Sequence, residues 1–209
     1  MMSYNIQAIC DAVGGELMAG DPSRLASAGV STDTRAISSG ALFVALGGEK
    51  FDAHDFLAQA VQAGAAGLVV SRIPEGFDPG PCGVIKVRDT LLALQRLARW
   101  YRDELGIPVI GITGSNGKTT TKDFTASVLR QRFTVNATRG NFNNHIGLPL
   151  TVLETGEDDE LCVLEMGMNH SGEIALLCEI ARPHIGVITN IGTAHIEFMG
   201  TREAIAEEK

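Results

Sequence analysis

Short apolar runs alternate with turn residues along the first part of the chain. Apolar residues at helical spacing predict a helix near the start, at Ile6, Ile9, Cys10 and Val13. Strands are predicted at residues 41–46, 67–70 and 84–87. A further helix fits residues 56–63, and the Pro- and Gly-rich residues 74–81 predict a loop. This pattern indicates a small α/β domain over residues 1–86.

A longer rhythm of helices and buried strands occupies residues 87–209. Apolar runs predict four strands, at residues 109–112, 133–135, 161–164 and 186–189. Helices are predicted at residues 90–104, 119–131, 172–181 and 201–209. Phe124 and Val128 are expected on the apolar face of the second of these helices. Strands that alternate with helices are typical of a doubly wound parallel sheet, so the fold class is α/β.

Composition and charge exclude several classes of function. The 209 residues are 44% hydrophobic, which is enough apolar material for the cores of one or two domains. A net charge of −8 argues against sequence-independent nucleic-acid binding, which requires clustered Lys and Arg. The chain has neither a signal-peptide pattern nor the apolar run of ~18 residues that spans a bilayer. We therefore expect a cytoplasmic, monomeric protein that does not insert into membranes.

The cysteines are expected to be core thiols. The four of them contain no Cys-x-x-Cys pair, and each lies in an apolar stretch or a loop. In a reducing cytosol, this spacing favours buried free thiols over disulfides or a zinc site.

Polar residues follow each predicted strand of the second domain. The first strand runs into residues 113–119, the second into residues 138–141, and the third into Glu165. The fourth runs into Asn190 and then His195. Because ligands of such sheets bind at the carboxyl ends of parallel strands, we expect these residues to meet at one edge.

The segment Gly-Ile-Thr-Gly-Ser-Asn-Gly-Lys-Thr-Thr, residues 111–120, predicts a phosphate-binding loop. A glycine-rich turn between a strand and a helix presents free backbone N–H groups and a helix dipole to an anion. Lys118 would reach the terminal phosphates, and the Thr119 hydroxyl would hold Mg²⁺. In the general pattern G-x-x-x-x-G-K-[ST] the first glycine would fall at Ile112, so the departure indicates a subclass.

Residues of two segments are candidate nucleotide contacts. The phosphate-binding segment supplies Thr113, Gly114, Ser115, Asn116, Gly117, Lys118, Thr119 and Thr120. The amide-rich residues 140–149 supply Asn141 and Asn144. Amide side chains offer neutral donors and acceptors to a nucleotide or substrate, although a turn-rich connection would have a similar composition.

Glu165 and His195 are the candidate metal ligands besides Thr119. Mg²⁺ prefers oxygen ligands and retains waters, so one carboxylate together with phosphates is the expected arrangement. Glu165 ends an apolar strand, where the alternative is a solvated carboxylate. His195 would lie near a second metal or the transferred phosphate, where the alternative is a structural histidine.

Taken together, the motifs resemble the Mur ligase family over essentially the whole chain. They are the segment 111–120, Glu-Met-Gly-Met-Asn-His at 165–170 and Asn-Ile-Gly-Thr-Ala-His at 190–195. Residues 31–35, 42–48 and 52–56 resemble the uridine-nucleotide-binding domain of the later-acting members. Residues 140–151 are similar to the loop of the members that add D-alanyl-D-alanine.

The resemblance implies an ATP- and Mg²⁺-dependent ligase of peptidoglycan precursor synthesis. ATP would phosphorylate the terminal carboxylate of UDP-N-acetylmuramoyl-tripeptide, and the amine of D-alanyl-D-alanine would attack the acyl phosphate. Residues 1–86 would bind the UDP substrate, and residues 87–209 would form an incomplete ATP-binding domain.

Motif positions also imply roles for individual residues. Catalytic roles fall on Lys118, His195 and Lys209, the last of which matches a lysine that relatives carry as a carbamate. Metal roles fall on Thr119, Glu165 and His195. The residues implied at the uridine diphosphate end are Ser31, Asp33, Thr34 and Arg35.

Two other functions stay open. One is a sister amide ligase, which would add a diamino acid, polymerise amino acids or extend folate with glutamate. The other is a phosphate-loop nucleotide-binding module without ligation chemistry. Because the helix at 201–209 has no C-cap, we also expect the chain to stop before a C-terminal domain and to be inactive alone. The third residue of the tripeptide is not determined by this sequence.

Overall fold

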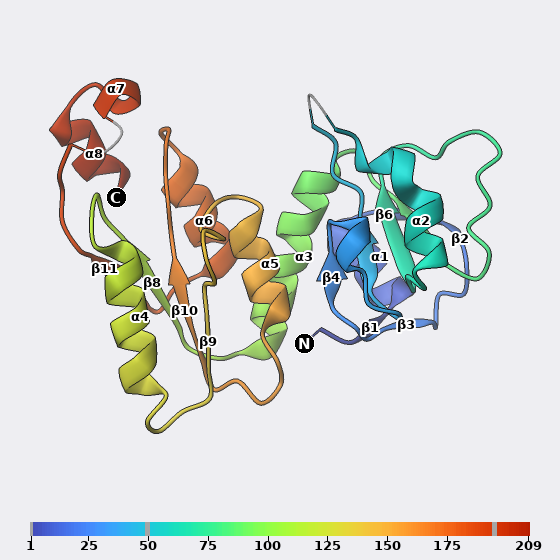
Figure 1. Ribbon diagram of the computed structural model, residues 1–209, viewed down its shortest axis with the longest axis horizontal. Coiled ribbons are helices and arrows are strands. Elements are labelled where there is room, and N and C mark those ends of the chain that lie inside the picture. The colour runs from blue at the N-terminus through green and yellow to red at the C-terminus, as the bar shows by residue number, and fades with distance from the viewer. Residues whose placement is uncertain (1, 49–50, 194–195) are drawn as a thin grey trace. The chain divides into compact units, whose positions relative to one another are not determined.

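The computed structural model describes residues 2–48, 51–193 and 196–209 and contains two compact units. They are Met1–Trp100 and Tyr101–Lys209, and each contains a largely or wholly parallel sheet (Figure 1). The predicted α/β fold is therefore confirmed. The division falls inside helix α3 (Thr90–Leu105). The assignment of UDP-substrate binding to residues 1–86 and of ATP binding to residues 87–209 stays a prediction.

A five-stranded sheet of order β2-β7-β6-β5-β4 forms the first unit. Its strands are β2 (Glu16–Ala19), β4 (Val30–Ser31), β5 (Leu42–Val44), β6 (Gly67–Val70) and β7 (Gly83–Lys86). All neighbours pair in parallel except the edge strand β2, which is antiparallel to β7. β1 (Tyr4–Asn5) and β3 (Leu25–Ala26) form a separate antiparallel pair. The three predicted strands are confirmed as β5, β6 and β7, whereas β1, β2, β3 and β4 were not predicted.

Helix α1 (Ile6–Val13) packs against this sheet at Gly67 and Gly83. The Asn5 side chain caps the helix by accepting a hydrogen bond from the Ala8 N–H at 2.8 Å. The four predicted apolar residues of α1 are all buried. A Cβ atom at Gly67 would lie 2.5 Å from the Ile6 Cδ1 atom, so glycine permits this close approach.

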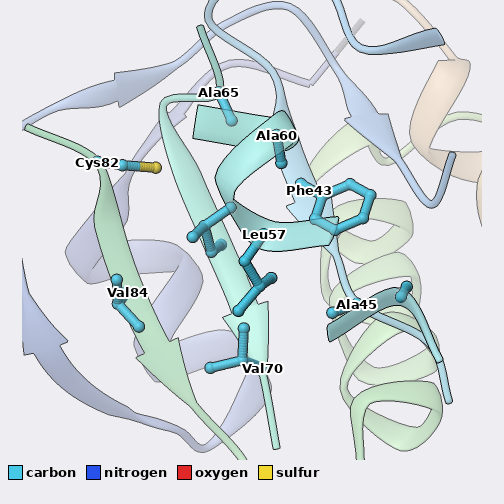
Figure 2. Close-up of a cluster of buried hydrophobic side chains, with 10 residues drawn as sticks. Phe43, Ala45, Leu57, Ala60, Ala65, Val70, Cys82 and Val84 are labelled. Carbon is cyan, nitrogen blue, oxygen red and sulfur yellow. The ribbon is translucent and has the colours of Figure 1, made fainter. Parts of the chain in front are cut away.

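One part of the core of the first unit lies between the sheet and the short helices η2 (Ala53–Phe56) and α2 (Leu57–Gln62). Figure 2 shows Leu57 and Ala60 facing side chains of β5, β6 and β7. β5 and β6 are buried along their whole length, as expected of parallel strands covered on both faces. A further turn, η1 (Thr34–Ala36), follows β4.

The second unit has a four-stranded parallel sheet of order β11-β8-β10-β9. The strands are β8 (Val109–Thr113), β9 (Val135–Ala137), β10 (Leu161–Glu165) and β11 (Ile185–Ile188). The helices are α4 (Lys118–Leu129), α5 (Gly147–Glu154), α6 (Glu173–Ala181), α7 (Ile196–Met199) and α8 (Arg202–Glu208). Strands β8, β10 and β11 and helices α4, α6 and α8 lie close to their predicted positions.

Three details of the second unit differ from the predictions. Strand β9 begins two residues late, at Val135. Helix α5 was not predicted, because Pro149 and the amides before it read as a loop; proline is tolerated in the first turn of a helix, where its missing N–H is not needed. The orientation of Phe124 and Val128 was wrong: they are 71% and 70% exposed, and Lys122 and Ala126 form the buried positions of α4.

The cysteines are free thiols in apolar surroundings, as predicted. Three of them are buried, and Cys178 is half-buried. Burial raises the pKa of the Cys82 thiol to about 11 and that of Cys162 to about 12. None of the helices in the described part of the chain combines the length and the apolar character needed to cross a membrane.

Candidate functional site

The segments that follow the four parallel strands of the second unit meet at one edge of its sheet, as predicted. After β8 and β11, the Ser115 N–H donates to the Asn190 carbonyl at 3.0 Å, and the Gly192 N–H donates to the Ser115 hydroxyl at 2.8 Å. After β9 and β10, the Glu165 N–H donates to the Thr138 hydroxyl at 2.9 Å. The sheet topology therefore collects the polar residues into one region.

The glycine-rich loop between β8 and α4 has the backbone of a phosphate cradle. Gly114 and Gly117 have φ angles of 142° and 78°, which side-chain-bearing residues rarely adopt. No side chain caps the N-terminus of α4, so the dipole and N–H groups of its first turn remain available to an anion. Lys118 Nζ donates to the Gly114 carbonyl at 2.8 Å and so lies across the loop.

Apart from the half-buried Lys118, the predicted nucleotide residues of this loop divide into two groups. Thr113, Gly114 and Ser115 are buried and shape the loop. The second group is exposed and comprises Asn116, Gly117, Thr119 and Thr120. Only the exposed group presents its hydroxyl, amide and backbone groups to solvent, where a nucleotide would bind.

Glu165 is buried at the end of β10 with one carboxylate oxygen unpaired. The residue is 2% exposed, and its Oε1 atom accepts a hydrogen bond from Asn143 Nδ2 at 2.8 Å. Its Oε2 atom and the Thr113 hydroxyl are the buried side-chain oxygens without a partner in the described part of the chain. An unpaired buried carboxylate oxygen is unfavourable, and a hard cation would satisfy it. The residues present therefore fit a Mg²⁺ ion.

The carboxylate cluster of an all-protein metal cage is absent from the described residues, where no three His, Cys, Asp or Glu side chains group around a metal position. Mg²⁺ is usually held by one or two carboxylates together with phosphates and water. His195 lies outside the described residues, so its predicted metal and catalytic roles stay predictions.

Lys122 is a buried cation that the sequence analysis did not single out. It is 5% exposed; its ammonium donates to the Thr138 carbonyl at 2.9 Å and forms an ion pair with Asp123 at 2.7 Å. Because the Thr138 hydroxyl accepts from the Glu165 N–H, Lys122 supports the backbone beside the unpaired carboxylate. A lysine at helical spacing gives no sign in the sequence that it will be buried.

A cavity of about 300 Å³ opens between the phosphate-binding segment and the amide-rich loop. Its lining includes Lys118 and the predicted Asn141 and Asn144, with Asn143 and Asn169 beside them. The Asn144 side chain also caps α5 by accepting from the Gly147 N–H at 2.8 Å. The structure thus brings the two predicted asparagines and the predicted lysine to one cavity and adds Asn143, which was missed.

Lys209 is held near Lys118 by the end of helix α8. The Glu208 carboxylate accepts hydrogen bonds from the Gly172 N–H at 2.8 Å and the Ile174 N–H at 2.9 Å, at the start of α6. Burial lowers the pKa of the Lys209 ammonium, and the charge of Lys118 lowers it further. The amine of Lys209 is therefore neutral more often than that of an exposed lysine.

The first unit contains a separate cavity of about 490 Å³. Three of the four predicted uridine diphosphate residues line it, namely Asp33, Thr34 and Arg35. Ser31 lies outside the lining, and its hydroxyl donates to the Asp33 carbonyl at 2.9 Å. The Phe51 and Phe56 rings, which also line the cavity, stack with centroids 5.0 Å apart. Hydrogen bonding from Arg35 lowers the pKa of Asp33 to about 2.

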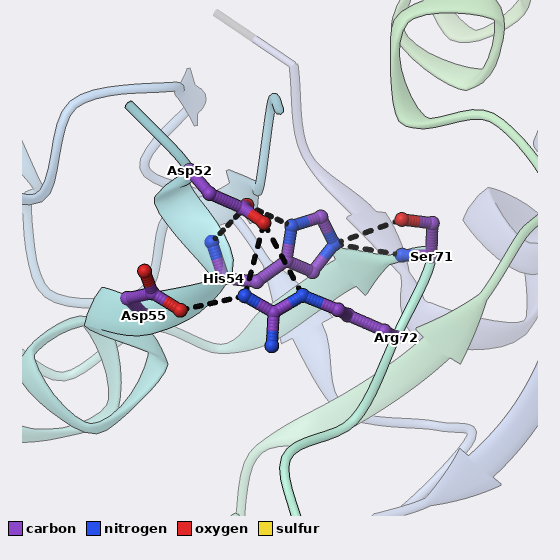
Figure 3. Close-up of polar contacts among 5 residues, drawn as sticks. All are labelled: Asp52, His54, Asp55, Ser71 and Arg72. Atoms are coloured by element: carbon purple, nitrogen blue, oxygen red, sulfur yellow. Dashed lines mark hydrogen bonds and ion pairs between the residues drawn. The ribbon is translucent and has the colours of Figure 1, made fainter. Parts of the chain in front are cut away.

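A polar network fixes the wall of this cavity that η2 forms (Figure 3). His54 is 3% exposed, and its Nε2 atom accepts from the Ser71 N–H at 2.9 Å. The Nδ1 atom must then carry the ring proton and donate to Asp52 Oδ1 at 2.5 Å. Arg72 joins Asp52 and Asp55, at 2.9 and 2.6 Å.

Comparison with known proteins gives consistent matches along the chain. The model for the Mur ligase middle domain matches residues 112–209, and that for the Mur ligase family, catalytic domain, matches residues 27–102. The chain is 50% identical over 210 residues to UDP-N-acetylmuramoyl-tripeptide--D-alanyl-D-alanine ligase of Bacillus subtilis, covering 100% of this chain and 46% of the relative. The ligase of the same name from Escherichia coli is 41% identical, with 100% and 45% covered.

Solved structures agree with these matches. A crystal structure of MurF from Acinetobacter baumannii superposes with a TM-score of 0.91 at 37% identity, covering 100% of this chain and 46% of that one. MurF from Thermotoga maritima in complex with ADP gives a TM-score of 0.77 at 38% identity, with 86% and 41% covered. The chain thus spans about half the length of the relatives it matches.

Proposed function

This chain belongs to the Mur ligase family, and we propose that it supplies the substrate- and nucleotide-binding parts of a ligase that joins D-alanyl-D-alanine to UDP-N-acetylmuramoyl-tripeptide. The observation that carries the proposal is the arrangement at the edge of the second sheet. There, Lys118 at an uncapped helix N-terminus lines the same cavity as Asn143, which donates a hydrogen bond to a buried Glu165 that keeps one oxygen unpaired. The names of the full-length relatives support the choice of substrates.

ATP is the proposed nucleotide. Its phosphates would bind the backbone N–H groups of the loop, Lys118 and the exposed hydroxyls of Thr119 and Thr120. Asn141 and Asn144 would contact it from the opposite side of the cavity. The similarity to a MurF crystallised with ADP supports this placement.

Mg²⁺ would be held by Glu165 Oε2 and the Thr119 hydroxyl, with His195 as a further candidate ligand. When bound, the ion neutralises phosphate oxygens and lets anionic groups approach one another.

The proposed reaction has two steps. The γ-phosphoryl group of ATP passes to the terminal carboxylate of the tripeptide, and ADP leaves. The amine of D-alanyl-D-alanine then attacks the acyl carbon, and inorganic phosphate leaves. Both steps concentrate negative charge, which Lys118 would stabilise as a fixed cation.

Lys209 is the proposed carbamate-bearing lysine. Carbon dioxide reacts with neutral amines, so the lowered pKa of Lys209 favours the modification. The carbamate would replace a cation near Lys118 with an anion, and so remove a like-charge contact.

The cavity of the first unit is the proposed site for the uridine diphosphate end. Arg35 offers a cation to the pyrophosphate, and Phe51 and Phe56 offer an aromatic wall to the base. Because UDP-linked precursors and ATP are cytoplasmic substrates, we propose that the protein acts in the cytoplasm. We also propose that it acts as a monomer.

Phosphate release tests the proposal. Protein expressed from the uninterrupted coding sequence would receive ATP, Mg²⁺ and UDP-N-acetylmuramoyl-tripeptide, with D-alanyl-D-alanine or single amino acids as the amine. We expect release only with the dipeptide, and none from the 209-residue chain by itself. Release with a diamino acid would identify a sister ligase, and release independent of any amine would leave a nucleotide-binding module.

A further inference from the structure

Asn143 holds the carboxylate proposed to bind the metal, although the family motifs gave it no role. We propose that Asn143 is a positioning residue, which orients Glu165 so that Oε2 alone faces Mg²⁺. The inference rests on the proposed function, because it assigns Asn143 to the same metal site.

This hydrogen bond gives the two carboxylate oxygens of Glu165 different roles. Asn143 Nδ2 donates to Glu165 Oε1 at 2.8 Å, whereas Oε2 is buried without a partner. An amide is a neutral donor, so it sets the orientation of the carboxylate and leaves its negative charge for a cation. An Arg or Lys in this position would compete with the metal for that charge.

Asn143 is itself held on both its backbone and its side chain. The Gly167 N–H donates to the Asn143 carbonyl at 2.8 Å, and the Asn143 N–H donates to the Asn141 carbonyl at 2.8 Å. A Cβ atom at Gly167 would lie 3.1 Å from the Asn143 side chain, so glycine leaves room for the amide in its present rotamer. Next along the loop, Asn144 caps α5. The amide is therefore fixed before a metal binds.

Asn136 provides a matched control, because it is a buried asparagine in the same unit that makes purely structural contacts. Its Nδ2 atom donates to the Thr151 carbonyl at 2.9 Å and the Thr155 hydroxyl at 2.8 Å. Replacing it should lower stability and leave metal binding unchanged. Replacing Asn143 should weaken metal binding, because it frees the orientation of Glu165.

The test measures Mn²⁺ binding to the full chain in the presence of ADP. Electron paramagnetic resonance detects the bound ion and requires no turnover. Asn143→Ala should weaken Mn²⁺ binding roughly 10- to 100-fold, as is typical for the loss of a residue that orients a metal ligand. Asn136→Ala should lower the melting temperature without that loss. Glu165→Gln should leave only weak Mn²⁺ binding, and in that background Asn143→Ala should not weaken the remaining binding further, since both residues act through one carboxylate.

Four outcomes would overturn the inference. Unchanged Mn²⁺ affinity in Asn143→Ala, with the wild type binding normally, would remove the positioning role and leave the proposed function intact. Equal losses in Asn136→Ala and Asn143→Ala, or an undiminished loss in the Glu165→Gln background, would show an effect of folding alone. A wild-type chain that binds no Mn²⁺ with ADP would overturn the proposed nucleotide site, and the inference with it.

Discussion

Replacing Gly114 by alanine should weaken nucleotide binding by the phosphate-binding loop more than the addition of one methyl group would suggest. Gly114 has a φ of 142°, a region that costs an L-residue on the order of 1–3 kcal/mol. The added Cβ would also overlap the Thr189 hydroxyl, which donates to the Asn116 carbonyl at 2.6 Å. Loss of that hydrogen bond adds about 1 kcal/mol. In the free variant the loop would relax to relieve the strain, so ADP binding would have to restore the strained conformation. The expected total of about 2–4 kcal/mol then corresponds to roughly 30- to 700-fold weaker ADP binding.

Isothermal titration with ADP would measure the loss, with Gly117→Ala as the matched control. Gly117 also has a positive φ, of 78°, but nothing lies within 4 Å of a Cβ placed on it. Its substitution should therefore cost only the backbone strain of about 1–2 kcal/mol.

A double variant separates the two contributions of the Gly114 substitution. Gly114→Ala and Thr189→Ala remove the same Thr189–Asn116 hydrogen bond, so the double variant should lose less ADP affinity than the sum of the two single losses, and should leave the part caused by φ. The reasoning would be refuted if Gly114→Ala bound ADP as well as Gly117→Ala, or if the Thr189 substitution simply added to the loss.

Three further substitutions test other parts of the two units. Glu165→Gln should abolish most Mn²⁺ binding in calorimetry with ADP, yet leave the melting temperature equal or higher, because it removes a buried charge with an unpaired oxygen; a large drop in melting temperature would contradict this. Lys122→Met should destabilise the chain in urea by about 1.5–3 kcal/mol, because the buried Thr138 carbonyl loses a charged donor; an unchanged midpoint would show that water replaces the ammonium. Hydrogen bonding from the His54 N–H lowers the pKa of Asp52 to about 2, so its carboxylate contributes stability above the ordinary pKa near 3.8, and this contribution is lost as the pH falls towards 2. The stability difference between wild type and Asp52→Asn should therefore shrink over that window, and a constant difference would rule out the linkage.

The local chemistry of the phosphate-binding loop could be predicted from the sequence because it depends on neighbouring residues. Glycines that permit positive φ, a lysine at the first position of the helix and an apolar strand before them all lie within residues 109–118. Parallel strands that are buried on both faces likewise have continuous apolar sequences. The strand β6 was therefore predicted with its observed bounds, Gly67–Val70. Sequence-local physics therefore determined the fold class, the loop and the side chains that could contact a nucleotide.

The partners of those side chains were decided by tertiary structure. Phe124 and Val128 look like core residues at helical spacing, but in the described structure α4 buries Lys122 instead, because the Thr138 carbonyl offers it a partner. Asn143 cannot be told from its neighbouring asparagines by composition, and it gains a distinct role only because strand pairing brings Glu165 within 2.8 Å. Hydrogen bonds between residues far apart in sequence depend on strand order and register, which no local pattern encodes. The sequence by itself thus determined which groups could bind phosphate and metal, and the tertiary structure decided which oxygen of Glu165 was left free to do so.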